Sequence, residues 1–141
     1  MPTPRVLFVC VKNGGKSQMA AGLMRQAVHD AGTAIDVDSA GTKAGTALNP
    51  QSAASLAEVG VDISDQSPQQ LTDEMVRAAD LVVVLGSEAQ VESVGGTPVE
   101  VWETDEPSQR GIEGADRMNL IREDITARIR ELHQRLSNST P

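Results

Sequence analysis

The sequence predicts an α/β sandwich with a parallel sheet of four strands. Two short runs, at residues 6–9 and 81–85, are apolar without interruption, as in strands that are buried on both faces. Stretches with helical apolar spacing separate the predicted strands, and this alternation is typical of a parallel sheet covered by helices. A chain of 141 residues is long enough to bury a sizeable core, and we expect residues 1–141 to form a single domain.

The first half of the chain predicts two strands and two helices. A strand over residues 6–10 leads into a Gly-rich turn and then into a helix, for which Ser17 is the expected N-cap. Residues 35–39 alternate between apolar and polar side chains, which predicts a short strand. Asn49 and Pro50 then begin a second helix, because asparagine is a good N-cap and proline fits the first helical position.

The second half predicts two more strands and further helices. A short helix is expected to begin at Ser67 or at Thr72, ahead of the second apolar strand. A loop with a short helix is predicted over residues 86–94, and a last strand over residues 98–102. The apolar side chains of the closing helix recur at steps of three and four, so they form a stripe that must pack on the domain. They are Met118, Ile121, Ile125, Ile129, Leu132 and Leu136.

The turn after the first strand has the composition of an anion-binding loop. Cys10 ends the strand, and the next six residues include two glycines, an asparagine and two lysines. The glycines allow successive backbone N–H groups to point inward, and the N-terminus of the following helix adds a positive dipole. We therefore expect an anion at this turn. The residues expected to hold it are Lys12, Asn13, Gly14, Gly15 and Lys16.

Cys10 is the expected nucleophile of this site. A helix N-terminus and neighbouring cations favour the thiolate, which is the reactive form of a cysteine. The competing interpretation is a buried structural cysteine without chemistry. A nucleotide-binding loop is another alternative, because residues 14–17 read Gly-Gly-Lys-Ser. The first glycine of that motif would fall on Cys10, however, and no carboxylate follows the apolar run at residues 81–85.

Composition limits the expected partners and compartment. Twelve basic against 20 acidic residues give a net charge of −8, which argues against a nucleic-acid partner and against binding to an anionic membrane. The single cysteine excludes an internal disulfide and fits a reducing cytosol. No signal peptide and no long apolar segment are apparent, so we expect a cytoplasmic protein. His29 and His133 lack neighbours at metal-ligand spacing, and we expect no metal site.

Together these motifs resemble those of the low-molecular-weight protein tyrosine phosphatase superfamily over nearly the whole chain. The loop of that superfamily reads Cys, five residues, Arg, Ser. Cys10, Asn13 and Ser17 match this loop, whereas Lys16 stands in place of the arginine. Further landmarks match in the same order, at residues 17–20, 39–41, 49–50, 60–64 and 80–83. The resemblance implies a three-layer sandwich with a four-stranded parallel sheet.

The resemblance also implies a general acid on a late loop. The acid of the superfamily is a carboxylate directly before a proline, which corresponds to Glu106, with Asp105 one residue upstream. Either carboxyl group would protonate the departing oxygen. The hydroxyl of Ser17 would donate a hydrogen bond to the thiolate of Cys10 and stabilise it. The catalytic residues that the resemblance implies are Cys10, Lys16, Ser17, Asp105 and Glu106.

Departures from the pattern favour the arsenate reductase branch of the superfamily. The chain has no tyrosine, whereas the tyrosine phosphatases line their cleft with aromatic side chains. Thioredoxin-coupled arsenate reductases use two further cysteines, but Gly86 stands at the position of the first and the chain has only Cys10. Because no second cysteine is present, an internal disulfide relay is impossible here. Ala21 and Gln69 also replace the carboxylates of that branch's monovalent-cation site.

These features imply a single-cysteine arsenate reductase that works with an external thiol. We expect arsenate or another tetrahedral oxyanion as substrate, mycothiol or another low-molecular-weight thiol as cosubstrate, no tightly bound cofactor, and a glutaredoxin-like partner such as mycoredoxin. The role would be detoxification in arsenical resistance. Two alternatives stay open, namely a phosphatase acting on a phosphomonoester and an oxyanion-binding protein without chemistry. Whether Cys10 attacks arsenic itself or positions the external thiol also stays open.

Overall fold

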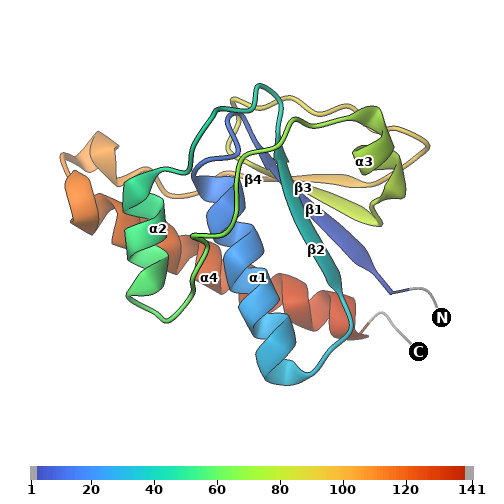
Figure 1. The fold of residues 1–141 in the computed structure, drawn as a ribbon, viewed down its shortest axis with the longest axis horizontal. Helices are drawn as coiled ribbons and strands as arrows, with labels where there is room; N and C mark the ends of the chain where they lie inside the picture. The colour runs from blue at the N-terminus through green and yellow to red at the C-terminus, as the bar shows by residue number, and fades with distance from the viewer. Residues whose placement is uncertain (1–2, 139–141) are drawn as a thin grey trace.

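The computed structural model describes residues 3–138, which form one parallel sheet with helices on both faces (Figure 1). The four strands lie in the order β2-β1-β3-β4. In chain order the elements are β1 (Arg5–Cys10), α1 (Lys16–Ala31), β2 (Asp36–Gly41), α2 (Pro50–Ala57), α3 (Asp73–Ala78), β3 (Leu81–Leu85), β4 (Val99–Trp102), a 3₁₀ helix (Pro107–Arg110) and α4 (Gly114–Asn138). The predicted three-layer fold is confirmed.

The two central strands explain the uninterrupted apolar runs. β1 pairs with β2 and β3, and residues 6–9 are buried because helical layers cover both faces of the sheet. All strands run the same way, so their carboxyl ends share one edge, where Cys10, Gly41, Leu85 and Trp102 lie. Open α/β sheets bind their ligands at this edge. β2 begins and ends slightly later than the strand predicted over residues 35–39.

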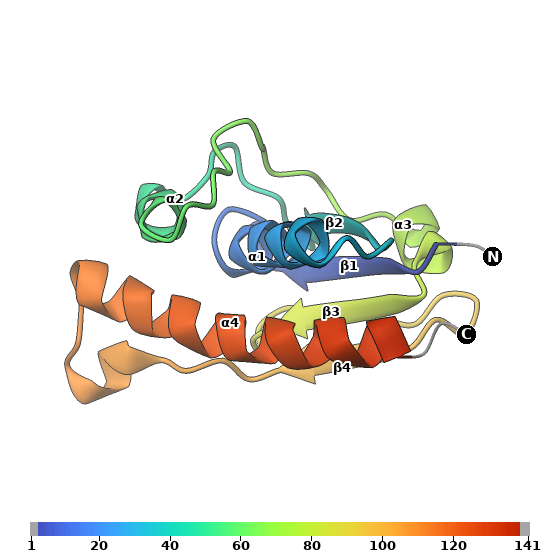
Figure 2. The same cartoon turned by 90° about the horizontal axis from the view of Figure 1, so that it is seen from below.

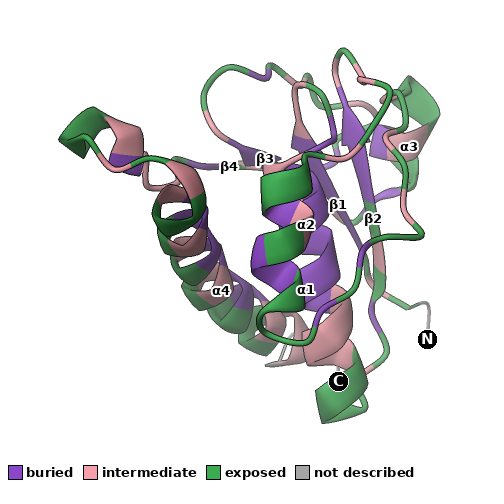
Figure 3. Ribbon diagram, turned by 60° about the vertical axis from the view of Figure 1, so that its left-hand side comes forward, coloured by how far each residue is buried: buried purple, intermediate pink, exposed green. Residues whose placement is uncertain are grey.

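Three helices cover one face of the sheet. Figure 1 shows α1, α2 and α4 on one side of the strands, and in Figure 2 α4 runs beside α1 on the side of β3 and β4. The apolar stripe of α4 packs into this layer, with Ile121, Ile125 and Ile129 fully buried, as the sequence predicts. Figure 3 shows the buried side of α4 turned toward α1. On the sheet beneath, the rings of Phe8 and Trp102 lie 6.0 Å apart.

α2 begins as predicted, at the pair Asn49 and Pro50. The side chain of Asn49 accepts hydrogen bonds from the backbone N–H groups of Gln51 and Ser52, at 2.8 and 3.3 Å. These bonds satisfy donors that the first turn of a helix leaves free. The backbone N–H of Asn49 donates in turn to the carbonyl oxygen of Gly14 at 2.7 Å. The start of α2 is therefore tied to the loop that follows β1.

α3 covers the opposite face of the sheet. The hydroxyl of Thr72 accepts a hydrogen bond from the backbone N–H of Met75 at 3.2 Å, so the helix begins at the later of the two predicted positions. Val76 of this helix packs with Leu7 and Val84 of the strands beneath it. No helix among residues 3–138 has the length and apolar character that crossing a membrane requires.

The prediction of a short helix within residues 86–94 is wrong. Between β3 and β4 the described chain is irregular. Its apolar side chains instead pack on the α3 face of the sheet, with Ala89 buried and Val91 and Val94 partly buried. The apolar side chains of this segment therefore contact the sheet without forming a helix.

Candidate active site

The loop between β1 and α1 joins a cysteine to a helix N-terminus. Cys10 is the last residue of β1 and Lys16 the first of α1. The backbone N–H groups of Lys12, Gly14 and Gly15 donate to no protein atom in the part of the chain that the structure describes. The first N–H groups of α1 also lack partners within the helix. Such a concentration of free donors at a helix N-terminus is suited to an oxyanion.

Two hydrogen-bond donors surround the sulfur of Cys10. The backbone N–H of Asn13 donates to Sγ at 3.3 Å, and Oγ of Ser17 lies 2.9 Å from Sγ. The Ser17 oxygen already accepts a hydrogen bond from Nδ2 of Asn13 at 2.8 Å. The hydroxyl proton of Ser17 is therefore free to point at the sulfur. Both donors stabilise a thiolate, which is the nucleophilic form of the side chain.

Ser17 does not cap α1, contrary to the prediction. The N-cap is Gly15, two residues before Ser17, and no side-chain hydrogen bond is made there. Ser17 is fully buried, and its hydroxyl is occupied by Cys10 and Asn13, so its oxygen is not available to the helix N–H groups. Because no side chain satisfies those groups, they stay available to an anion.

Asn13 connects the loop to the rest of the domain. Its backbone is left-handed, with φ at 56°, a conformation that asparagine tolerates better than most residues. Its Oδ1 accepts hydrogen bonds from Nε2 of Gln18 at 3.1 Å and from the backbone N–H of Gln69 at 3.0 Å. These two donors fix the amide so that Nδ2 faces Ser17. The sequence predicted Asn13 as a site residue but not its hydrogen bonds with Gln18 and Gln69, since Gln69 is 56 residues away along the chain.

Two glycines are required where the loop touches its neighbours. A Cβ atom at Gly41 would lie 2.6 Å from the carbonyl oxygen of Val11, and one at Gly14 would lie 2.9 Å from that of Ala47. Carbon and oxygen atoms do not approach so closely without displacement of the backbone. The loop therefore lies between the end of β2 and the segment before α2, and both neighbours fix its shape.

Gln69 and Ala21 occupy the positions where the resemblance placed the lost carboxylates. The Nε2 group of Gln69 donates to Oδ1 of Asp38 at 2.9 Å and to the carbonyl oxygen of Ser39 at 2.7 Å. Ala21 is buried in the core. Among residues 3–138 no cluster of three or more His, Cys, Asp or Glu side chains could hold a metal ion. The amide of Gln69 thus donates to two oxygens, of Asp38 and Ser39, that a cation could otherwise contact.

Asp105 and Glu106 lie between β4 and the 3₁₀ helix, and each is paired with an arginine. Arg110 donates to both carboxylate oxygens of Asp105, at 2.8 and 3.0 Å. Arg117 of α4 donates to both oxygens of Glu106, at 2.8 and 3.1 Å. Sequence reasoning missed both arginines, because nothing in the local pattern distinguishes them from other surface cations. Bidentate pairs of this kind are the stronger form of ion pair.

The cations around this loop lower the pKa of both carboxyl groups. Hydrogen bonds from Arg110 hold the pKa of Asp105 below its ordinary value, and those from Arg117 do the same for the pKa of Glu106. The positive charge of Lys16 lowers both pKa values further. Lys16 of the loop after β1 therefore interacts electrostatically with both carboxylates.

The three lysines of the chain all belong to this edge of the sheet. Lys12 and Lys16 are in the loop, and the segment that carries Lys43 runs alongside, since the N–H of Lys43 donates to the carbonyl oxygen of Val11 at 2.8 Å. Lys12 and Lys43 are exposed and Lys16 is half-buried. In a chain with a net charge of −8, all three lysines therefore lie in the loop after β1 and in the segment beside it.

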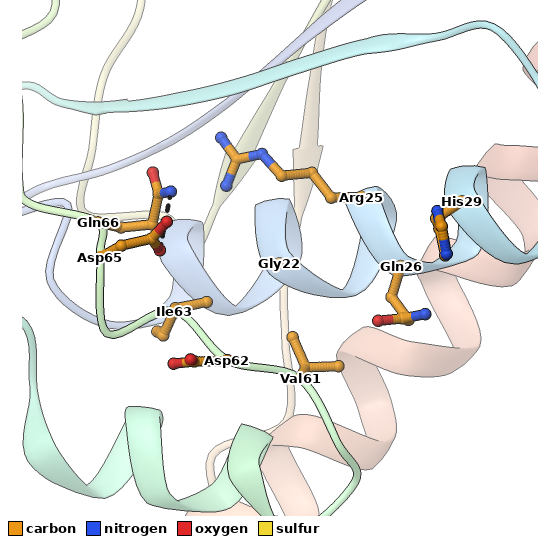
Figure 4. Close-up of a pocket in the computed structure, with 9 residues that line it drawn as sticks. All are labelled: Gly22, Arg25, Gln26, His29, Val61, Asp62, Ile63, Asp65 and Gln66. Atoms are coloured by element: carbon orange, nitrogen blue, oxygen red, sulfur yellow. Dashed lines mark hydrogen bonds between the residues drawn. The ribbon is translucent and has the colours of Figure 1, made fainter.

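A separate groove of about 230 Å³ lies along α1, between that helix and residues 61–66 (Figure 4). It is lined by the middle and end of α1, from Gly22 to His29, and by polar side chains that include Asp62 and Asp65. No residue of the loop at the helix N-terminus lines it. This groove is therefore distinct from the anion site.

The position after β3 offers no second thiol. Gly86 follows β3 directly, and its backbone N–H donates to the carbonyl oxygen of Trp102 at 2.8 Å. Cys10 is the only cysteine of the chain, and it is free. Any disulfide formed by Cys10 therefore needs a partner from another molecule.

This fold and this site define a class of enzyme in which a loop cysteine acts on a tetrahedral oxyanion. A sequence model of the low molecular weight phosphotyrosine protein phosphatase family matches residues 5–140, and the chain belongs to that family. Two relatives are arsenate reductases. The protein from Brevibacillus brevis is 35% identical over 131 residues, covering 89% of this chain and 91% of its own. That from Bacillus subtilis is 32% identical over 135 residues, covering 89% and 92%.

Solved structures of similar proteins have the same fold. A thioredoxin-dependent arsenate reductase from Corynebacterium glutamicum superposes with a TM-score of 0.80 at 37% identity, over 99% of this chain. This chain spans 64% of that protein. An arsenate reductase solved in its phosphate binding state has a TM-score of 0.80 at 25% identity, covering 96% of this chain and all of the other. That reductase shows that a protein of this fold can bind phosphate.

Proposed function

We propose that the protein is an arsenate reductase that uses Cys10 together with a thiol from another molecule. The observation that carries the proposal is the position of the only cysteine, whose sulfur lies 2.9 Å from the hydroxyl of Ser17 in a loop of free N–H donors. Relatives that are at least 30% identical over about nine-tenths of the chain are named arsenate reductases, which supports arsenate as the oxyanion.

The first step joins sulfur to arsenic. Backbone N–H groups and the ammonium group of Lys16 bind the arsenate oxygens, and the thiolate of Cys10 attacks the arsenic. One As–O bond breaks as the S–As bond forms, and a carboxyl group of Asp105 or Glu106 protonates the departing oxygen, which leaves as water. Arsenic stays in the +5 state in this adduct, so no electron has yet been transferred to it.

The second step transfers two electrons. An external thiolate attacks the sulfur of Cys10, and the electron pair of the S–As bond goes to arsenic, which leaves as arsenite. Cys10 and the external thiol become a mixed disulfide. A thiolate of the redoxin partner then attacks this disulfide, releases Cys10 as a thiolate and forms a new disulfide with the external thiol. If Cys10 only positions the external thiol, arsenic is bound to that thiol's sulfur, and the redoxin thiolate makes the second attack and forms the mixed disulfide. In both versions two thiols become one disulfide, and this supplies the two electrons.

We further propose mycothiol as the external thiol and a mycoredoxin-like protein as the partner. With one cysteine the chain cannot form a disulfide of its own for a redoxin to reduce, which favours a small thiol as the first electron donor. Thioredoxin is the competing donor, because the Corynebacterium glutamicum relative is thioredoxin-dependent. Thiol chemistry of this kind requires a reducing compartment, so we propose that the protein acts in the cytoplasm.

The test is arsenite formation from arsenate by the purified protein with three electron donors. These are a thioredoxin system, glutathione with glutaredoxin, and mycothiol with mycoredoxin. We expect turnover with mycothiol and mycoredoxin, and its complete loss in Cys10→Ser. Turnover with thioredoxin alone would contradict the proposed thiol while supporting arsenate reduction. No arsenite under any of the three conditions would contradict the proposed function itself.

Phosphomonoester hydrolysis is the second candidate, because the family to which the chain belongs is named for phosphatases. The same loop could bind phosphate, and Cys10 could form a phosphocysteine that water then cleaves. Lys16 weighs against high activity, since lysine offers a point charge where arginine offers two parallel donors to a tetrahedral oxyanion. Hydrolysis of an aryl phosphate without any added thiol distinguishes this function from arsenate reduction.

A further inference from the structure

Side chains of α4 hold the acid loop, defined here as residues 103–106. Arg117 donates to both carboxylate oxygens of Glu106, at 3.1 and 2.8 Å. Asp124 accepts a hydrogen bond from the backbone N–H of Asp105 at 2.8 Å. One side chain and one peptide group of the loop are thus attached to the longest helix of the structure.

Arg128 adds a third attachment. Its Nη2 donates to the carbonyl oxygen of Glu103 at 2.9 Å, and its Nε lies 3.3 Å from Oδ1 of Asp124. Arg117, Asp124 and Arg128 follow one another at steps of seven and four, which places them on one face of the helix. We call these three residues the α4 clamp.

The two carboxylates of the acid loop are held in different ways. Glu106 is bound to α4 in a pair whose side chains are 32% and 25% exposed. The partner of Asp105 is Arg110, which lies on the following 3₁₀ helix and is 52% exposed. Both pairs are bidentate, but Arg110 is more exposed than Arg117, and a more exposed ion pair contributes less stability. The pair of Asp105 can therefore open without disturbing α4, and that of Glu106 cannot.

We propose that the α4 clamp positions the acid loop through Glu106 and leaves Asp105 as the proton donor of the reaction. The clamp follows from the contacts above, whereas the role of Asp105 rests on the proposed function. In this scheme Arg117 is a positioning residue. It keeps Glu106 ionised and in place, and it thereby holds the segment that carries the neighbouring Asp105.

The charges around Asp105 explain how it could gain a proton. Arg110 from the 3₁₀ helix and Lys16 from the anion loop favour its ionised form, while Glu106 beside it and Asp124 from α4 are negative. A bound oxyanion adds negative charge and disfavours the carboxylate. Asp105 then takes a proton from solvent and releases Arg110. It gives this proton to the departing oxygen, which leaves as water, and the ion pair forms again.

The first test is the pH dependence of kcat for arsenite formation in single variants. A general acid must be protonated, so its removal abolishes the decline of kcat at alkaline pH. We expect Asp105→Asn to lose this decline and to lower kcat by about 100-fold or more. Glu106→Gln and Arg117→Gln should keep it and lower kcat by less than about tenfold. Arg130→Gln, an exposed position on the same helix, is the control and should match the wild type.

A double variant separates positioning from independent effects. If Arg117 acts only through Glu106, the double variant R117Q/E106Q should be no slower than the slower single variant. Additive losses in the double variant would contradict the clamp. Loss of the alkaline decline in Glu106→Gln, with the decline retained in Asp105→Asn, would identify Glu106 as the acid and overturn the assignment.

The second test needs no activity. The backbone N–H of Asp105 should exchange with solvent faster in Arg117→Gln and Asp124→Asn than in the wild type. Its exchange rate in Arg130→Gln should equal that of the wild type. Equal exchange in all four proteins would overturn the clamp. If the wild type forms no arsenite with any thiol, the proposed function fails while this test still decides the clamp. The pH profiles would then be measured on an aryl phosphate.

Discussion

At the scale of single residues, Asn13 has the most connections in the site. It adopts a left-handed backbone conformation, donates through Nδ2 to Ser17 and through its backbone N–H to Cys10, and accepts from Gln18 and Gln69. Its side chain decides which way the Ser17 hydroxyl points, and so where its proton lies. A chain of polarised hydrogen bonds of this kind transmits the position of one group to the next.

Asn13→Gly and Asn13→Ala separate backbone strain from the side-chain network. Both variants lose the amide, so we expect kcat to fall by about 10-fold or more in each, because the Ser17 hydroxyl is no longer oriented. Glycine adopts a left-handed conformation without strain, whereas alanine pays about 1–2 kcal/mol for it. Asn13→Ala should therefore be less stable than Asn13→Gly by about that amount. Urea unfolding measures the difference, and equal stability of the two variants would contradict the strain.

At the scale of elements, the anion loop is shaped by segments that lie far from it in sequence. The end of β2 touches Val11 so closely that only glycine fits at position 41, and the segment before α2 limits Gly14 in the same way. The loop is not an autonomous motif. Its conformation depends on the pairing of β1 with β2 and on the docking of the α2 start through Asn49.

Gly41→Ala and Gly45→Ala test this dependence as a matched pair. A Cβ atom at Gly41 would lie 2.6 Å from a backbone oxygen, whereas at Gly45 its nearest contact is 3.8 Å away. We expect Gly41→Ala to lower the free energy of unfolding by about 1–3 kcal/mol, as overpacking does elsewhere, and to reduce activity. Gly45→Ala should leave both nearly unchanged. Similar values for the two variants would show that the loop tolerates displacement.

The pairing of α4 with the acid loop predicts a pH-dependent contribution to stability. Hydrogen bonds from Arg117 lower the pKa of Glu106. A carboxylate with a lowered pKa adds stability above the unfolded-state pKa of about 4.3, and this stability is lost as the pH falls below that value. Arg117→Gln should be less stable than the wild type by about 1 kcal/mol at neutral pH.

Urea unfolding of both proteins across the acid range checks this sign. The difference in unfolding free energy between wild type and Arg117→Gln should shrink as the pH falls below about 4. The difference between wild type and Arg130→Gln should stay near zero throughout. A gap for Arg117→Gln that stays constant down to the lowest pH would mean that the ion pair is not the origin of the lost stability.

At the scale of the whole molecule, the charge distribution opposes the expected substrate except at one edge. The net charge of −8 repels oxyanions at long range. Lys12, Lys16 and Lys43, the only lysines of the chain, lie together at the carboxyl edge of the sheet. The lysines of the chain are therefore confined to the loop after β1 and the segment beside it.

Lys12→Gln and Lys43→Gln should weaken the attraction of a dianion to the site. We expect kcat/KM to fall several-fold in each at low ionic strength, with kcat less affected, because the two side chains are exposed. The effect should shrink at about 1 M salt, where the Debye length is about 3 Å. Arg130→Gln is the control. A loss in kcat/KM that salt does not change would indicate direct contact with substrate instead.

The sequence predicted the sheet and the place of the loop well, because these depend on short-range patterns. The apolar runs of β1 and β3, the cap at Asn49 and the stripe of α4 were all read from neighbours within a few residues. The prediction of a short helix within residues 86–94 was wrong, because the apolar side chains of this segment pack on the sheet from an irregular backbone. The prediction that Ser17 caps α1 was also wrong, since its hydroxyl is hydrogen-bonded with Cys10 and Asn13.

The sequence by itself determined that one thiol ends the first strand ahead of a Gly-rich loop with two lysines, and that any disulfide it forms needs a second molecule. These conclusions depend on residue types at short spacing and on a count of cysteines. Only the tertiary structure decided what surrounds that thiol and how the two carboxylates differ. Gln69 reaches Asn13 and Arg117 reaches Glu106 through the packing of elements, and such contacts have no local signature in the chain.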